Sequence, residues 1–201
     1  GSPGLDSVYK RYFEMFCEAF DYSKSITLPL CVNDTGCWFE NVINVADFKD
    51  KCSMCFPQHF FLYEKDFDEQ CKQLEQLGDE PYIHDKLFWI GTVYENGTLA
   101  RKEFAKIQND RIVNTSNLYI SHEDHTKYRY LIDIEGGFQE KCGYSARIVK
   151  LLHMKRLLFF VDRPIYSFFD YKLEPWVHFV PVKRDFSDLF EKIAWADSHP
   201  D

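Results

Sequence analysis

Glycine and proline are scarce in this 201-residue chain, which has nine glycines and eight prolines. Such low numbers exclude collagen-like and low-complexity proteins, which are rich in both residues. No run of the sequence approaches the roughly 20 apolar residues of a membrane-spanning helix. Basic residues are also outnumbered, since 24 lysines and arginines stand against 32 acidic residues and give a net charge of −8. This balance excludes a general nucleic-acid-binding protein, which needs an excess of positive charge to neutralise phosphates.

The composition that remains is that of a globular protein with many aromatic residues. Hydrophobic residues make up 45% of the chain and charged residues 28%, and there are 19 phenylalanines and 12 tyrosines. The length suits one large domain or two small lobes that share a cleft. Seven cysteines, an odd number, lie mostly in apolar or helical stretches. They indicate reduced core thiols and a reducing compartment rather than a disulfide framework.

Apolar residues recur at helical or strand spacing and predict alternating helices and strands. The predicted helices cover residues 5–20, 66–77, 98–107 and 145–155, with a last one from 185 or 187, and the main predicted strands cover residues 26–32, 87–91, 128–134, 157–161 and 177–182. This alternation predicts an α/β fold with a parallel sheet covered on both faces. A chain-breaking segment, Gly78–Pro81, places the boundary between two lobes, residues 1–80 and 81–201.

Two features could carry chemistry at the carboxyl ends of the strands, where parallel sheets bind ligands. Gly136 and Gly137 follow a strand, and Ser145 and Arg147 then open a helix, an arrangement that suits a phosphate group. The alternative is an ordinary turn with a surface arginine. Asp34 ends the strand from residue 26 and could act as a general base. Its alternative is turn chemistry, which the Asn-Asp-Thr-Gly sequence favours.

Metal binding is the weaker reading of the cysteines and histidines. Cys31, Cys37, Cys52 and Cys55 could form a four-thiolate zinc site, but the first spacing is longer than usual. The segment His122–His125 fits helix capping or a polar surface better than a metal site.

Three segments of the second half carry specific motifs. Residues 125–136 read HTKYRYLIDIEG, residues 143–147 read GYSAR, and residues 173–189 read LEPWVHFVPVKRDFSDL. They resemble motifs of glycosyltransferase family 90, which includes protein O-glucosyl- and xylosyltransferases, capsule-associated xylosyltransferases and bacterial lipopolysaccharide-modifying enzymes. Upstream the similarity is thinner, at residues 32–34 and at residues 87–92, which read LFWIGT.

The resemblance implies a glycosyltransferase B-like fold of two Rossmann-like lobes with parallel sheets, the N-terminal lobe being reduced. It implies inverting, metal-independent transfer of a sugar from a UDP-sugar to a hydroxyl of a glycan (lipopolysaccharide or surface polysaccharide) or of a protein. By carry-over Asp34 is the catalytic base. The implied donor-binding residues are Gly91, Thr92, Asp124, His125, Tyr128, Gly143, Tyr144, Ser145 and Arg147. No cofactor or metal is implied beside the donor substrate.

One departure from the family pattern keeps a second interpretation open. Ile90 replaces the arginine of the family's Trp-Arg-Gly, so anion binding would depend on Arg147, with Arg101 or Lys102 as further contributors. The alternative function is a catalytically impaired nucleotide- or sugar-binding module of the same fold. We expect a cytoplasmic protein, with the endoplasmic reticulum lumen as the alternative for a eukaryotic source. A lipid-linked acceptor would add peripheral membrane association.

Overall fold

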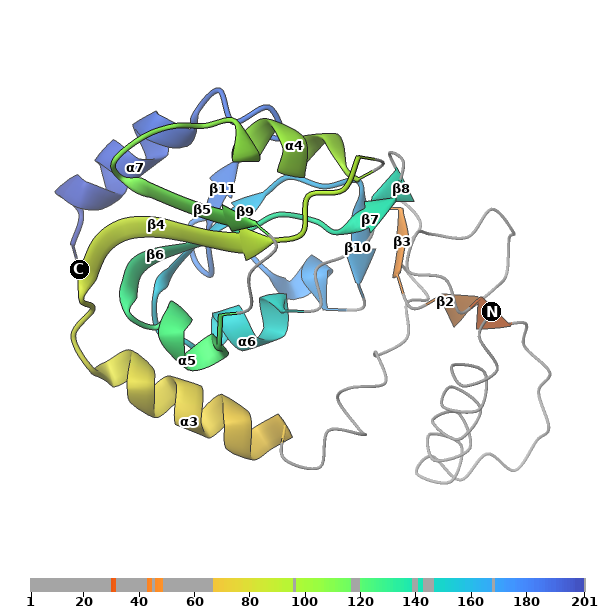
Figure 1. Ribbon diagram of the computed structural model, residues 1–201. Helices are drawn as coiled ribbons and strands as arrows, with labels where there is room; N and C mark the ends of the chain where they lie inside the picture. The colour runs from red at the N-terminus through yellow and green to blue at the C-terminus, as the bar shows by residue number, and fades with distance from the viewer. Residues whose placement is uncertain are drawn as a thin grey trace, which may run out of the picture.

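The computed structural model describes residues 67–95, 97–116, 120–138, 141–142, 147–167 and 169–200, together with three short strands before residue 49. Its centre is a five-stranded sheet in which every neighbouring pair is parallel (Figure 1). In spatial order the strands are β11 (Val180–Val182), β9 (Leu157–Val161), β6 (Tyr128–Asp133), β4 (His84–Gly91) and β5 (Ile112–Ser116). The predicted α/β class with a parallel sheet is therefore confirmed.

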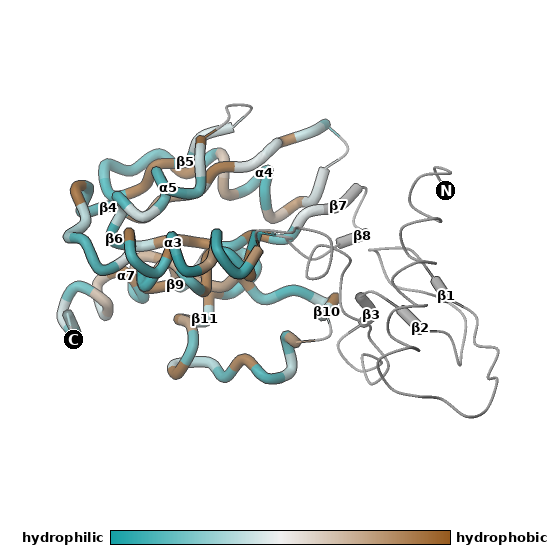
Figure 2. The backbone as a smooth tube through the Cα atoms, turned by 90° about the horizontal axis from the view of Figure 1, so that it is seen from below, coloured by the Kyte–Doolittle hydropathy of each residue, from teal (hydrophilic) through white to brown (hydrophobic). Residues whose placement is uncertain are grey.

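Helices cover both faces of this sheet (Figure 1). On one face lie α3 (Phe67–Asp79), α5 (His122–His125) and α6 (Ile148–Leu152), and on the other lie α4 (Leu99–Ala105) and α7 (Leu189–Ser198). Seen from below, α3 crosses in front of the strands (Figure 2). In the part of the chain that the structure describes, no helix is both long enough and apolar enough for a bilayer crossing.

The strands divide the interior into two cores because successive side chains point to opposite faces. In β4, Leu87 and Trp89 pack with α4 and α7, whereas Phe88 and Ile90 pack with α3 and α6. Phe104 of α4 is completely buried. Burying a side chain of this size stabilises the fold by about 1.5–3 kcal/mol.

Helix α3 forms because its apolar residues recur at spacings of four and three. Phe67, Cys71 and Leu74 are buried against the sheet, and acidic residues occupy the first turn, where the helix dipole favours them. Near the end of the helix a Cβ on Gly78 would lie 2.3 Å from the carbonyl oxygen of Met154. Only glycine permits this approach, so α3 and the segment after α6 pack backbone to backbone.

Short strand pairs complete the structure. β1 (Leu30–Cys31) pairs in parallel with β2 (Ile43–Asn44), and β7 (Gly137–Phe138) pairs with β8 (Lys141–Cys142) in an antiparallel hairpin. β3 (Ala46–Phe48) pairs antiparallel with β10 (Ile165–Ser167), which precedes a 3-10 turn, η2 (Asp170–Lys172). The β3–β10 pair joins the first fifty residues to the second half of the chain. The two lobes and their boundary stay predictions. Helix α3 lies before the predicted boundary in sequence, but it packs on the five-stranded sheet that follows it.

Two predicted elements differ from the structure for local reasons. The strand predicted over residues 177–182 begins only at Val180, because residues 176–179 form a turn in which the Trp176 amide donates to the Phe179 carbonyl at 2.7 Å. Trp176 has a φ of 66° there. The helix predicted over residues 145–155 is found as α6, and it stops at Leu152 shortly before Lys155, whose φ is 49°. Residues 143–146 lie outside the described part.

One strand of the sheet is missing from the prediction. β5 contains Asn114, Thr115 and Ser116, which do not read as a strand. The Asn114 amide donates to the carbonyls of Phe104 (3.0 Å) and Ile107 (2.9 Å) at the end of α4. A polar residue is stable in this strand because it caps the neighbouring helix.

Candidate functional site

A cavity of about 210 Å³ opens at the carboxyl end of β4. It is lined by Ile90, Gly91, Thr92, Ile120, His122, His125 and Arg147. Four of the predicted donor-binding residues, from three separate segments of the chain, therefore share one cavity. Gly91, Thr92 and Arg147 meet because the carboxyl ends of parallel strands lie at the same edge of a sheet. His125 comes from α5, which packs on Phe88 of β4.

Arg147 is the main cation of this cavity. It immediately precedes α6, and Nη1 of its guanidinium donates to the Ile90 carbonyl, while Nε lies 3.7 Å from Oδ1 of Asp133. The remaining Nη2 is buried and has no hydrogen-bond partner among the described residues. Burial lowers the pKa of the Arg147 guanidinium, and Asp133 opposes this shift. A buried donor without a partner is costly, and an anionic ligand would satisfy it.

A second guanidinium approaches from the other side of the sheet. Arg101 of α4 donates to the carbonyls of Thr92 (3.3 Å) and Ile134 (3.4 Å). Its pKa is lowered by burial and by the nearby charge of Arg147. Both guanidinium groups lie about 6 Å from the ring of Trp89, at 5.9 and 6.0 Å. Two like charges thus converge beside the loop at residues 91 and 92.

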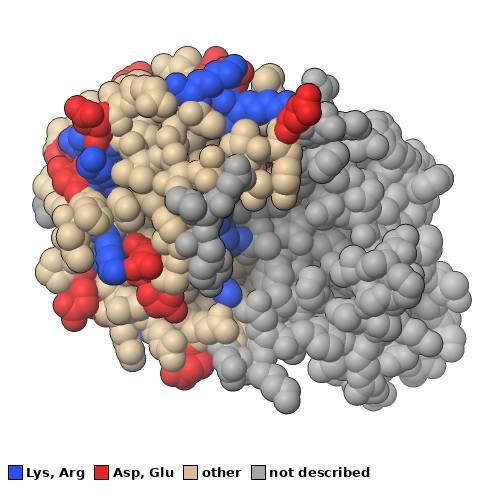
Figure 3. All heavy atoms as spheres, in the orientation of Figure 1, with Lys and Arg blue, Asp and Glu red and all other residues tan. Residues whose placement is uncertain are grey.

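The charges around this edge of the sheet do not balance. We define the arginine–carboxylate cluster by its guanidinium groups, which are Arg101, Arg147, Arg163 and Arg184, and its buried carboxyl groups, which are Asp133, Glu135 and Asp170. The cations outnumber the carboxylates by one. Burial also raises the pKa of Glu135, and the ion pair with Arg184 at 2.6 Å opposes this shift. The cluster is locally positive although the chain is acidic, and basic side chains also gather over α4 (Figure 3).

His125 presents a hydrogen-bond acceptor to the cavity. Its Nδ1 lies 2.7 Å from the Ser121 carbonyl oxygen, which can only accept, so Nδ1 carries the proton. Burial lowers the pKa of His125 to about 4, so the ring is neutral at pH 7. Nε2 is then an acceptor, and it is buried without a partner in the part of the chain that the structure describes.

Two predicted donor-binding residues lie beside the cavity but do not line it. Asp124 belongs to the cap of α5, where its amide donates to Ser121 Oγ at 3.2 Å and its carboxylate pairs with Lys127. Tyr128 stacks on Phe88, with ring centroids 4.2 Å apart. Both support the segment that carries His125.

Gly91 has a packing role that the sequence does not reveal. A Cβ at this position would lie 2.4 Å from the Trp89 ring. The absence of a side chain lets the loop turn directly over the indole, and this places Thr92 at the cavity.

The remaining predictions fall on parts of the chain outside the described residues. These are the proposed base Asp34, the donor-loop residues Gly143, Tyr144 and Ser145, and the zinc candidates Cys37, Cys52 and Cys55. Within the described ranges, no three His, Cys, Asp or Glu side chains are placed to hold a metal ion.

Sequence reasoning missed two contributors and ranked a third too low. Ile120 and His122 line the cavity, and the His122 ring stacks on that of His125 with centroids 5.6 Å apart. The three-residue spacing of the histidines in a helical turn was the available signal. Arg101, which the sequence indicates only as a further contributor to anion binding, contacts the same loop as Arg147.

Comparison with known proteins identifies the family of this chain. The family model of glycosyl transferase family 90 matches residues 92–201, more than half of the chain. Protein O-glucosyltransferase 2 of Danio rerio is 37% identical over 81 residues, which cover 40% of this chain and 15% of that protein. Protein O-glucosyltransferase 1 of Rattus norvegicus is 36% identical over 78 residues, covering 39% and 19%.

A viral protein is also similar. Uncharacterized protein 179R of Invertebrate iridescent virus 6 is 32% identical over 107 residues, covering 45% of this chain and 8% of that protein. The aligned part amounts to less than a fifth of each of these three relatives. Because the family model matches more than half of the chain, from Thr92 to the C-terminal side of α7, the chain belongs to glycosyltransferase family 90.

Proposed function

We propose that this protein is an inverting glycosyltransferase that moves a glucosyl group from UDP-glucose to a hydroxyl of a protein. The observation that carries the proposal is the Arg147 guanidinium in the cavity at the end of β4, with its Nη2 buried and unpartnered within the described residues. The relatives named protein O-glucosyltransferases support the choice of sugar and of acceptor.

The diphosphate of the donor would bind beside Arg147. Its Nη2 supplies one charge-assisted hydrogen bond, and the positive excess of the arginine–carboxylate cluster opposes the negative charge that grows on the departing group. These side chains supply the charge stabilisation for which many transferases use a divalent ion. The proposed reaction is therefore independent of a metal and of any cofactor.

His125 would bind the nucleoside part. Its neutral ring offers an acceptor at Nε2, which fits an N–H of uracil or a ribose hydroxyl. Thr92 lies on the same cavity and would border the diphosphate. A matched acceptor of this kind favours ligands that bring a donor and disfavours those that bring a second acceptor.

The transfer itself would be a single displacement. The acceptor oxygen attacks the anomeric carbon from the face opposite the diphosphate, and its proton passes to the carboxylate of Asp34. The bond between the anomeric carbon and the phosphate oxygen breaks, and its electron pair leaves with UDP. One displacement inverts the anomeric configuration, and correct positioning of the two substrates supplies much of the rate.

In this proposal each of the two substrates binds to one of the two lobes of a glycosyltransferase B fold. Residues 81–201, with α3 packed on their sheet, form the nucleotide-sugar lobe, and the preceding residues form a reduced acceptor lobe that carries Asp34. A glycan acceptor, including lipopolysaccharide or a surface polysaccharide, is the alternative to a protein hydroxyl.

A second candidate function rests on Ile90. This residue stands where the family has an arginine, and its side chain is buried in the core at 8% exposure. The position therefore brings no charge to the cavity, and its carbonyl accepts from Arg147. A binding module that holds the nucleotide without turnover would follow if Arg101 does not replace the missing charge.

An assay of UDP release and sugar transfer tests the proposal. The purified protein is incubated with UDP-glucose or UDP-xylose as the donor and with serine-bearing protein fragments or oligosaccharides as acceptors. Mass spectrometry then identifies the products by their gain in mass. Asp34→Asn should lower the transfer rate about 10²- to 10⁴-fold, as expected for loss of a general base. Asp110→Asn, which changes an exposed aspartate before the amino end of β5, is the matched control.

The outcomes separate the two candidate functions. Glucose transfer that depends on Asp34 supports the enzyme, and the acceptor that gains mass decides between protein and glycan. UDP binding without turnover on any acceptor supports the binding module. Turnover that Asp34→Asn leaves unchanged would refute the assigned base.

A further inference from the structure

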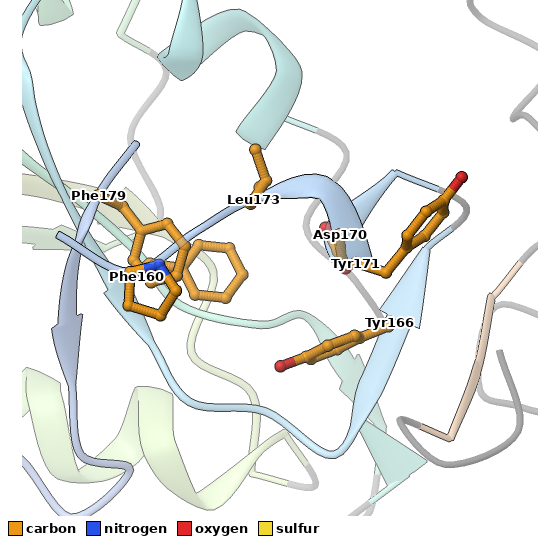
Figure 4. Close-up of a pocket in the computed structure, with 7 residues that line it drawn as sticks. Phe160, Tyr166, Asp170, Tyr171, Leu173 and Phe179 are labelled. Carbon is orange, nitrogen blue, oxygen red and sulfur yellow. The ribbon is translucent and has the colours of Figure 1, made fainter. Parts of the chain in front are cut away.

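A second cavity, of about 140 Å³, lies beside β10 and η2 (Figure 4). It shares no lining residue with the cavity at the end of β4. Its volume is far above the roughly 10–15 Å³ that a single water needs. It has room for part of a small organic molecule, and the chemistry of its walls indicates which kind.

Aromatic rings form much of the wall. Phe160 and Phe179 pack with ring centroids 4.9 Å apart. The Tyr166 side chain reaches across towards these two rings, with its hydroxyl end leading, whereas the Tyr171 ring points away from them (Figure 4). An aromatic face binds the C–H face of a sugar ring, because both surfaces are flat, apolar and bordered by polar groups.

A buried carboxylate supplies the polar contact. Oδ2 of Asp170 accepts from Nη2 of Arg163 at 2.7 Å and from the Ser167 amide at 2.8 Å, so the orientation of the carboxylate is fixed. Oδ1 is buried and has no partner among the described residues. The Asp170 side chain is only 2% exposed and lines the cavity. An acceptor with this surplus capacity fits a ligand that brings hydroxyl groups.

We propose that this cavity binds one monosaccharide unit of a neutral glycan, separately from the nucleotide. No basic residue is among the described residues that line the cavity, and Oδ1 of Asp170 is an acceptor, so phosphate and other anions are disfavoured. The unsatisfied oxygen also disfavours a purely apolar ligand. A neutral sugar satisfies both surfaces at once, since its hydroxyls donate to Asp170 and its C–H face covers the Tyr166 ring.

The two cavities are joined through two buried side chains, Asp133 and Arg163. Asp133 at the end of β6 lies 3.7 Å from Nε of Arg147 and 3.4 Å from Nη1 of Arg163. Arg163 in turn holds Asp170. These alternating guanidinium and carboxylate groups lie between the sugar cavity and the proposed donor cavity. The inference goes beyond the proposed function, because sugar binding here requires no nucleotide.

Saturation-transfer difference NMR with methyl β-D-glucopyranoside tests the proposal, with and without excess UDP. The sugar should give signals in both samples, and Tyr166→Ala should weaken its affinity about tenfold, as expected for loss of one aromatic surface. Tyr166→Phe should retain binding, because the ring remains. Tyr82→Ala is the control and should bind the sugar as the wild type does. It removes a half-exposed tyrosine that lies just before the amino end of β4 and does not line the sugar cavity.

A second measurement does not depend on how the variants fold. In a titration of the wild-type protein with the same sugar, the amide signals of Tyr171 and Leu173 should shift, and those of Thr92 and Ile120 should not. Absence of sugar signals, competition by UDP, or equal losses in Tyr166→Ala and Tyr82→Ala would each overturn the inference. Sugar binding in a protein that fails to bind UDP would uphold it while refuting the proposed function.

Discussion

Replacing His125 should remove a pH dependence from the stability of the fold. Burial lowers the pKa of this residue from 6.5 to about 4. Between these two values the unfolded chain binds a proton that the folded chain does not, so the free energy of unfolding falls as the pH falls through this window. This lowering of the pKa corresponds to about 3 kcal/mol in the free energy of unfolding. The protein loses this whole contribution only when the pH is below the pKa that His125 has in the folded state.

The test is urea unfolding at about pH 7 and about pH 4.5, for the wild type and for His125→Gln. Glutamine keeps a polar group near the position of Nε2 but does not titrate. The wild type should lose about 2–3 kcal/mol more between the two pH values than the variant does. If both proteins show the same pH dependence, His125 is not held neutral by burial, and its assignment as a fixed acceptor fails.

Two further predictions concern packing and a buried polar contact. Gly91→Ala should lower the free energy of unfolding by about 1–3 kcal/mol, because the new Cβ would lie 2.4 Å from the Trp89 ring; unchanged stability and unchanged tryptophan fluorescence would contradict this. Asp197→Ala should cost about 1–2 kcal/mol, because this carboxylate accepts from Arg111 and Tyr130, each at 2.8 Å. Chemical denaturation measures both effects, and an Asp197 variant as stable as the wild type would show that these contacts contribute nothing.

Much of the fold could be predicted because the strongest signals are local. β9 has the predicted bounds, since its five consecutive apolar residues, Leu157–Val161, are buried almost throughout. β5 could not be predicted in the same way. Its Asn114 belongs in a strand only because α4 ends where the amide can cap it, and that contact depends on tertiary structure.

The site was predictable to the extent that topology determines it. Gly91 and Arg147 come from distant segments, yet Gly91 ends β4 and Arg147 follows β6, two strands whose carboxyl ends lie at one edge of the parallel sheet. His125 reaches the same cavity from α5, which packs on Phe88 of β4. Arg101 is different, because it reaches the loop from a helix on the opposite face and no motif marks it. Asp170 likewise gains its place from Arg163 and from the Ser167 amide, which are contacts that no sequence spacing indicates.

Calorimetric titration with UDP tests the central claim most directly, which is that Arg147 binds the diphosphate. UDP should bind the wild type, and Arg147→Met should raise the Kd about 10- to 100-fold, the effect of losing a charge-assisted hydrogen bond. Arg111→Met, which removes a guanidinium at the opposite end of the sheet, should leave the Kd unchanged. The claim would be contradicted if UDP failed to bind the wild type, or if a folded Arg147→Met variant bound UDP as tightly as the wild type does.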